Sequence, residues 1–143
     1  MATRIQVTFD SNDPARLAEF WEAAMGYKTE DPPPGFATWE EFLASINVPA
    51  GEFDGASLVD PDGVGPRFFF QKVPEGKTAK NRLHLDLAVS GGRGVPLELR
   101  EQRVRAEAAR LTALGAKVQW INIENNHFAI VMQDPEGNEF CLH

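Results

Sequence analysis

The chain has 143 residues, 43% of them hydrophobic, which is enough for one folded domain or two small units sharing a core and argues against disorder. Its 21 acidic and 14 basic residues give a net charge of −7, which opposes non-specific nucleic-acid binding. No apolar run is long enough to span a membrane, and a single cysteine, Cys141, excludes an internal disulfide framework, so we expect a cytoplasmic protein.

The first strand and helix are indicated by their hydrophobic spacing. Residues 4–9 alternate apolar and polar side chains, which predicts a strand with Gln6 and Thr8 on its polar face. Asp13-Pro14 then opens a helix, because aspartate caps helix N-termini and proline is tolerated at the first helical position. Gly26 ends it. The apolar stripe of this helix comprises Leu17, Phe20, Trp21, Ala24 and Met25.

A short strand around residues 27–30 precedes an irregular stretch, residues 31–51. A proline run at 32–34 breaks regular structure, and a short amphipathic segment follows it. The apolar side chains of that segment are Trp39, Phe42, Leu43 and Ile46. Aromatic residues after a proline break predict a flap that lies on the body of the protein, and Trp39 is therefore a candidate ligand contact.

Two strands joined by a turn complete the first half. The strands are expected at residues 53–59 and 67–73, and Asp60-Pro61-Asp62-Gly63 between them has the composition of a turn. Three consecutive phenylalanines in the second strand must face both sides of the sheet. Phe69 shares a face with Gln71, which makes these two candidate ligand contacts, whereas Phe68 and Phe70 are expected to face the helix.

The second half begins with a strand at residues 83–89. Leu83, Leu85 and Leu87 alternate with polar residues, which predicts a core-facing leucine face. His84 and Asp86 then share the opposite face, about 6.6 Å apart along the strand. They are candidates for a general base and its orienting carboxylate, since histidine titrates near neutral pH. The alternative is that they simply satisfy each other or pair with Arg82 or Lys80.

A helix and three strands follow. The helix is expected at about 97–114, and the strands at 117–123, 128–133 and 139–142. Exposed charges four residues apart on the helix are expected to pair, Glu101 with Arg105 and Arg103 with Glu107. The apolar face of the helix comprises Val104, Ala108 and Leu111, and Gly115 ends it.

The two halves repeat the same order of elements. Met25-Gly26-Tyr27-Lys28 matches Leu114-Gly115-Ala116-Lys117, and Asp60-Pro61-Asp62-Gly63 matches Asp134-Pro135-Glu136-Gly137. The interval from glycine to turn aspartate is 34 residues in the first half and 19 in the second, so the first half carries an insertion within residues 31–51. We expect an α+β protein with two βαβββ modules, residues 1–78 and 79–143.

A strand-helix-three-strand unit used twice, with an Asp-Pro-Asp/Glu-Gly turn before each last strand, resembles the vicinal oxygen chelate superfamily, which includes glyoxalase I, bleomycin-resistance proteins and extradiol dioxygenases. The chain is most similar to glyoxalase-like proteins common in actinobacteria. The segments that carry this likeness are 13–21, 58–63, 80–87 and 134–141. The resemblance implies that cupped mixed sheets enclose a cavity, that a divalent metal is held there in the enzymes, and that the protein is a homodimer.

The resemblance also implies where metal ligands would lie. The first-strand positions are Gln6 and His84, and the last-strand positions are Gln71 and Cys141. The carboxylate usual at the end of each unit is absent, and two neutral amides are weak ligands. We therefore expect no cofactor, with a divalent metal on these four residues as the alternative. His127 and His143 do not match the motif.

Two hypotheses follow. In the first, the chain binds a small organic molecule without a classical metal site, and its ligand contacts are Gln6, Thr8, Trp39, Phe69, Gln71 and Cys141. Cys141 could also be a nucleophile, although a lone cysteine in a strand is more often a small buried hydrophobe. In the second, the chain is a lyase, isomerase or dioxygenase of the same superfamily acting on a small oxygenated metabolite, with His84 as base.

Overall fold

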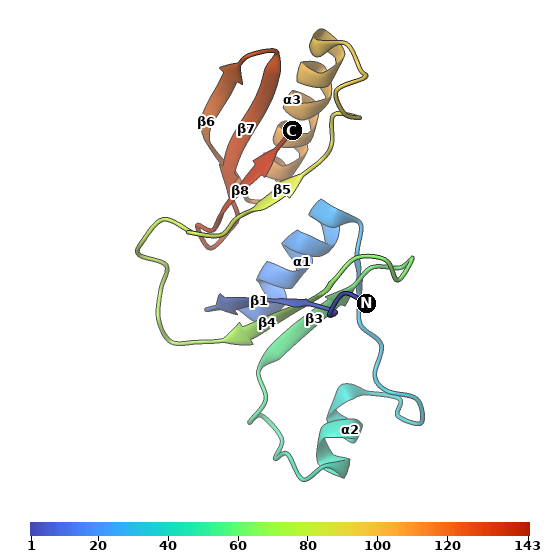
Figure 1. The fold of residues 1–143 in the computed structure, drawn as a ribbon. Coiled ribbons are helices and arrows are strands. Elements are labelled where there is room, and N and C mark those ends of the chain that lie inside the picture. The colour runs from blue at the N-terminus through green and yellow to red at the C-terminus, as the bar shows by residue number, and fades with distance from the viewer. The chain divides into compact units, whose positions relative to one another are not determined.

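The computed structural model describes all 143 residues and divides the chain into two compact units, Met1–Gly76 and Lys77–His143 (Figure 1). Each unit contains a strand, a long helix and three further strands, and its strands form one four-stranded mixed sheet. The prediction of an α+β fold with two βαβββ modules is confirmed. None of the three helices combines the length and hydrophobicity that a membrane-spanning segment needs.

The sheet of the first unit has the strand order β1-β4-β3-β2. Its first and last strands pair in parallel, and the other pairs are antiparallel. The strands are β1 (Gln6–Ser11), β2 (Lys28–Thr29), β3 (Gly55–Val59) and β4 (Arg67–Lys72). Since β1 begins two residues later than the pattern indicated, Ile5 lies outside the strand and is 69% exposed.

Helix α1 (Pro14–Met25) covers one face of this sheet. Its predicted ends are confirmed: the Asp13 carboxylate accepts a hydrogen bond from the Arg16 backbone N–H, and Gly26 adopts a left-handed φ of 70°. Phe68 and Phe70 of β4 are buried on the helix side, as their alternation predicted. The core of the unit also contains Leu17, Phe20, Trp21 and Leu58.

The insertion lies between β2 and β3 and carries helix α2 (Trp39–Ser45). Thr38 caps that helix by accepting a hydrogen bond from the Glu41 backbone N–H. No residue of α2 is buried, and Figure 1 shows the segment extending away from the sheet at the bottom of the view. A hydrogen bond ties α2 to the residue that follows β2: the Trp39 indole N–H donates to the Glu30 carbonyl oxygen at 2.9 Å.

The second unit repeats this topology with the strand order β5-β8-β7-β6. β5 and β8 are parallel, and the other pairs are antiparallel. Its elements are β5 (Leu85–Leu87), α3 (Leu97–Ala113), β6 (Lys117–Glu124), β7 (His127–Gln133) and β8 (Glu139–Leu142). The predicted helix face, Val104, Ala108 and Leu111, is buried against this sheet.

Two predictions about α3 and β5 need correction. Glu101 does pair with Arg105, but Arg103 donates to the Ser90 carbonyl oxygen instead of pairing with Glu107, which pairs with Arg110. Leu83 is 75% exposed and lies outside β5. The physical reason is the register: Leu85 pairs with Phe140, so β8 has no strand residue left to pair with Leu83.

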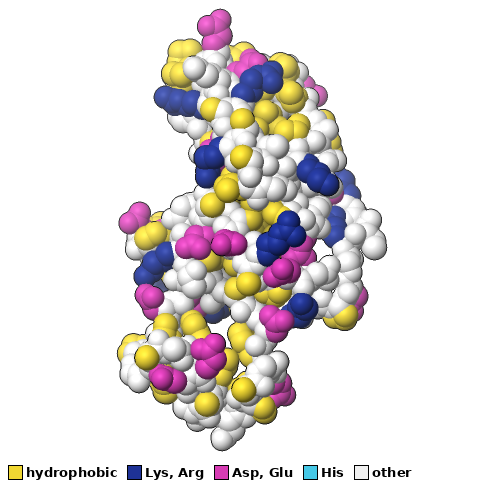
Figure 2. All heavy atoms as spheres, turned by 180° about the vertical axis from the view of Figure 1, so that it is seen from behind, with side chains coloured by type: hydrophobic (Ala, Val, Ile, Leu, Met, Phe, Trp, Pro, Cys, Tyr) yellow, Lys and Arg dark blue, Asp and Glu magenta, His cyan; other side chains and the backbone are white.

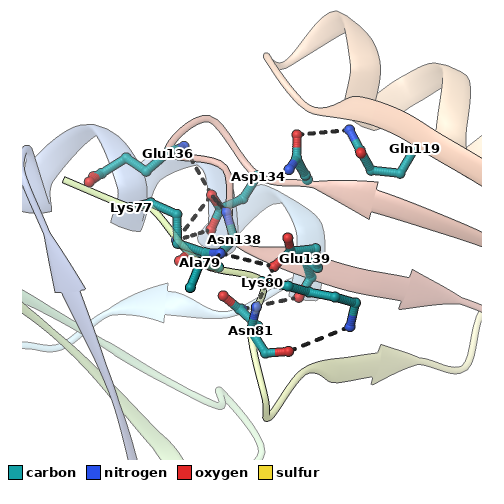
Figure 3. A network of polar contacts seen from close by, with 10 residues as sticks. Lys77, Ala79, Lys80, Asn81, Gln119, Asp134, Glu136, Asn138 and Glu139 are labelled. Atoms are coloured by element: carbon teal, nitrogen blue, oxygen red, sulfur yellow. Dashed lines mark hydrogen bonds and ion pairs between the residues drawn. The ribbon is translucent and has the colours of Figure 1, made fainter.

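The turn between β7 and β8 is held by a buried carboxylate, as Figure 3 shows. Asp134 is 2% exposed and accepts hydrogen bonds from the backbone N–H groups of Glu136 and Asn138 and from the Asn138 side chain. Next to this turn, Lys77 forms a 3.2 Å ion pair with Glu139. This ion pair anchors Lys77 to β8.

Candidate functional site

The face of the first sheet that α1 does not cover, here called the open face of unit 1, carries four of the predicted contacts. Gln6 and Thr8 from β1 and Phe69 and Gln71 from β4 share it, because Gln6, Thr8 and Asp10 pair in register with Arg67, Phe69 and Gln71. Gln6 and Thr8 are exposed, and the Gln6 amide nitrogen lies 3.3 Å from the Thr8 hydroxyl. The structure therefore groups these residues as the sequence indicated.

Arg67 is at the centre of the polar contacts on this face. Its guanidinium donates to the Gln6 side-chain oxygen at 2.8 Å and to the Glu30 carboxylate at 2.8 Å. Burial alone would raise the pKa of Glu30, but hydrogen bonds from Arg67 and Ser57 and the charge of Arg67 outweigh it and hold the pKa below its ordinary value. Sequence reasoning missed Arg67, although it has the same strand parity as Phe69 and Gln71.

An aromatic surface adjoins this polar group. Phe69 stacks on Phe53 with ring centroids 5.9 Å apart, and the Arg67 guanidinium carbon lies 5.6 Å from the Phe69 centroid. At the other end of the face, the Gln71 amide donates to the Asp10 carboxylate at 2.6 Å. An aromatic platform beside an arginine can bind a flat organic molecule that carries oxygen atoms.

A cavity of about 920 Å³, here called the insertion pocket, lies between α1, the insertion and β3. Trp39, Phe53 and Arg67 line it, so it connects the flap with the open face of unit 1. Figure 2 shows the insertion as the lower lobe, with hydrophobic and acidic side chains gathered on it. The prediction that Trp39 contacts a ligand stays a prediction, but the structure places its side chain in the wall of a cavity.

The corresponding open face of unit 2 carries the predicted acid–base pair. The His84 Nδ1 atom lies 2.9 Å from an Asp86 carboxylate oxygen, and both side chains are about half exposed, at 47% and 53%. His84 precedes β5 by one residue, and Asp86 pairs in register with Cys141 on β8. The structure therefore brings His84, Asp86 and Cys141 together on one sheet face.

The environment of Cys141 opposes a role as nucleophile. Burial, followed by the negative charge of Asp86, raises the pKa of the thiol to about 11. We expect iodoacetamide to alkylate Cys141 slowly at pH 7–8 and roughly tenfold faster for each pH unit up to about pH 11. Mass spectrometry at a series of pH values measures this rate, and rapid alkylation at pH 7 would contradict the assignment.

Two other histidines lie near the end of the second sheet. The His127 and His143 rings are 6.2 Å apart between centroids. The structure contains no grouping of three or more His, Cys, Asp or Glu side chains placed to hold a metal ion.

Comparisons with known proteins agree on the fold. Residues 6–143 match the family described as the glyoxalase-like domain. A search of curated proteins found no match. Similar solved structures include a glyoxalase/bleomycin resistance protein/dioxygenase family enzyme from Burkholderia phytofirmans, with 17% identity, a TM-score of 0.60 and coverage of 96% of this chain and 94% of that one.

Two further solved structures have the same fold. A manganese-bound variant of the fosfomycin resistance protein FosX from Listeria monocytogenes has 11% identity, a TM-score of 0.66 and coverage of 100% of this chain and 92% of that one. A hypothetical protein from S. aureus has 12% identity, a TM-score of 0.61 and coverage of 99% and 96%. At these identities the likeness extends to the fold and not to a shared reaction.

Proposed function

Because the chain belongs to the glyoxalase-like domain family, we propose that it binds a small organic molecule in the insertion pocket and on the adjoining open face of unit 1. The observation that carries this proposal is the pocket itself. Its volume of about 920 Å³ is within the range of small-molecule sites, roughly 300–1,000 Å³. Apolar side chains with a few convergent polar groups are the usual lining of such sites, and Trp39, Phe53 and Arg67 fit that description.

The first test is a thermal-shift screen of small organic compounds, since a ligand that binds the native state raises its stability. We expect any ligand found to lose affinity in a Trp39→Ala variant and to bind normally in a Trp120→Ala control. Trp39 lines the pocket, whereas Trp120 lies on β6 in the other unit and is 48% exposed. Equal binding by both variants would remove the pocket from the site.

We further propose that no divalent metal takes part, because the four positions implied by the fold family do not fit one. The Gln6 side-chain oxygen already accepts a hydrogen bond from the Arg67 cation. Gln71, whose amide group donates to Asp10, offers only a neutral amide oxygen, which is a weak ligand. Burial and the charge of Asp86 raise the pKa of the Cys141 thiol, so its deprotonation on metal binding would cost affinity at neutral pH. His84 is left as the single strong donor.

Elemental analysis of purified protein tests this proposal. We expect less than about one-tenth of an equivalent of nickel, manganese, iron or zinc after exchange into metal-free buffer. One equivalent of metal in the wild-type protein, lost in a His84→Ala variant, would contradict it.

A second candidate function, proton-transfer catalysis, is favoured by the His84–Asp86 contact. If the Nδ1–H group donates to Asp86, the Nε2 lone pair is free to take a proton from a carbon next to a substrate carbonyl. This requires Asp86 to hold the ring orientation. Any lyase or isomerase turnover found in a substrate screen should then be abolished by His84→Gln and reduced by Asp86→Asn. Turnover that survives His84→Gln would remove this candidate.

We also propose a subfamily, an oligomeric state and a cellular location for this chain. Membership of the group common in actinobacteria rests on the motifs at 13–21, 58–63, 80–87 and 134–141. A homodimer is expected from the family, and sedimentation as a monomer at micromolar concentration would contradict it. A cytoplasmic location rests on the single cysteine and the composition of the chain.

A further inference from the structure

The insertion pocket contains an excess of negative charge over a mainly apolar lining. From this we infer that its ligand is an organic cation, an aromatic or alicyclic body that carries an ammonium group. The inference rests on the proposed function, because it assigns a ligand class to the same pocket. It concerns unit 1 alone, where every lining residue lies.

The apolar walls come in part from two helices, α1 and α2. Ala15 and Ala18 lie three residues apart on α1, and Trp39 and Leu43 lie four residues apart on α2, so each pair lies on one face of its helix. Ala44, next to Leu43, also lines the pocket. No residue of α2 is buried. Filling the pocket with an apolar body would remove this surface from water, which is favourable in proportion to the area covered.

The charges come from the same two helices. Glu19 and Glu22 project from α1, and Glu40 projects from α2. Glu19 and Glu40 make no hydrogen bond or ion pair, and Glu22 accepts a single bond from the Thr29 backbone N–H. Two carboxylates from different helices that line one pocket and form no ion pair are complementary to a positively charged ligand.

The cations in the lining do not cancel this charge. Arg67 is already paired with the Glu30 carboxylate, which lies outside the pocket lining. Arg16 is the remaining cation of the lining, which also contains the three glutamates Glu19, Glu22 and Glu40. The Asp13 carboxylate lies at the positive end of the α1 dipole and offsets that partial charge. The pocket is therefore net negative.

Trp39 supplies a further preference for cations. Its indole N–H is satisfied by the Glu30 carbonyl oxygen, and Glu30 is not among the residues that line the pocket. An ammonium group within about 6 Å of an indole face is attracted by the ring quadrupole. Carboxylates and an indole face in one apolar pocket together distinguish a cation from neutral and anionic molecules of the same size.

Three probes with the same aromatic body test this inference: naphthylmethyltrimethylammonium, naphthylmethanol and naphthylacetate. We expect the ammonium probe to bind about tenfold more tightly than naphthylacetate in equilibrium dialysis against the full chain at low salt. The double variant Glu19→Gln/Glu40→Gln should weaken the ammonium probe about fivefold and leave naphthylmethanol unchanged. Glu98→Gln/Glu124→Gln is the matched control, because it changes the net charge equally on exposed residues outside the pocket.

A pair of blocking variants locates the binding. Ala44→Trp fills the pocket from α2, and Ala106→Trp makes the same change on an exposed position of α3. We expect only the first to abolish binding. If all three probes bind equally and Ala44→Trp still blocks them, the cation inference fails and the proposed function stands. If no probe binds, or if Ala44→Trp instead dissociates a dimer in sedimentation, the pocket is not a small-molecule site. In that case the cation inference and the proposed function both fail.

Discussion

Replacing Trp21 by alanine is expected to lower the free energy of unfolding by about 3–5 kcal/mol. Trp21 is 1% exposed, and its ring packs against Phe9 at 5.4 Å and Phe20 at 5.5 Å between centroids. It joins α1 to the covered face of the first sheet, so its removal leaves a cavity at the centre of unit 1. Urea denaturation followed by circular dichroism measures this loss without depending on the tryptophan signal.

Trp120→Ala is the matched control for this prediction. The same side chain is removed from β6, where it is 48% exposed, and substitutions at such positions usually change stability by no more than about 0.5 kcal/mol. Equal losses for the two variants would show that burial in the described fold does not determine the contribution of either ring.

The features predicted best were those that depend on local periodicity. Alternation alone placed Phe68 and Phe70 in the core and Phe69 on the opposite face, because successive side chains of a strand point to opposite sides. The ends of α1 were likewise fixed by local chemistry at Asp13 and Gly26. The repeated Asp-Pro turns then revealed two equivalent modules, because the two segments have to make the same chain reversal.

The features that were missed depend on pairing between distant residues. Arg67 finds its carboxylate partner, Glu30, 37 residues away across the β2–β3 region, and no sequence period encodes that contact. Arg103 could have paired with Glu107 on its own helix, but a nearby carbonyl at Ser90 offers it a competing acceptor. Helix spacing predicts which charges are neighbours, whereas the fold decides which partner each one takes.

In the candidate site, too, the features set by local periodicity were predicted, and those set by packing between distant residues were not. Strand parity grouped Phe69 with Gln71 correctly on one face, since parity survives small errors in strand ends, whereas the association of Gln6 with Gln71 came from the family resemblance. The insertion pocket could not be predicted, because it depends on how far residues 31–51 extend from the sheet. Length and composition identify an insertion, but the insertion pocket forms only when the insertion packs beside α1 and β3.

Replacing Asp134 by alanine is expected to cost unit 2 about 2–4 kcal/mol, because the buried carboxylate satisfies several donors at once. Two backbone N–H groups and the Asn138 amide would lose their acceptor inside a turn that is largely shielded from water. Asp134→Asn keeps one carbonyl oxygen and should cost roughly half as much. Chemical denaturation of the two variants and the wild type measures the difference.

Asp62→Ala is the control for this prediction, since Asp62 occupies the matching turn of unit 1 with an exposed side chain, and its loss should have little effect.

The effect of Asp134→Ala should extend beyond stability to the reactivity of Cys141. The turn sets where β8 begins, and β8 places Cys141 beside Asp86. If the turn loosens, burial of the thiol decreases, and Cys141 should be alkylated faster at neutral pH in this variant than in the wild type. A destabilised variant with unchanged Cys141 reactivity would show that the register of β8 is held by its neighbouring strands and not by the turn.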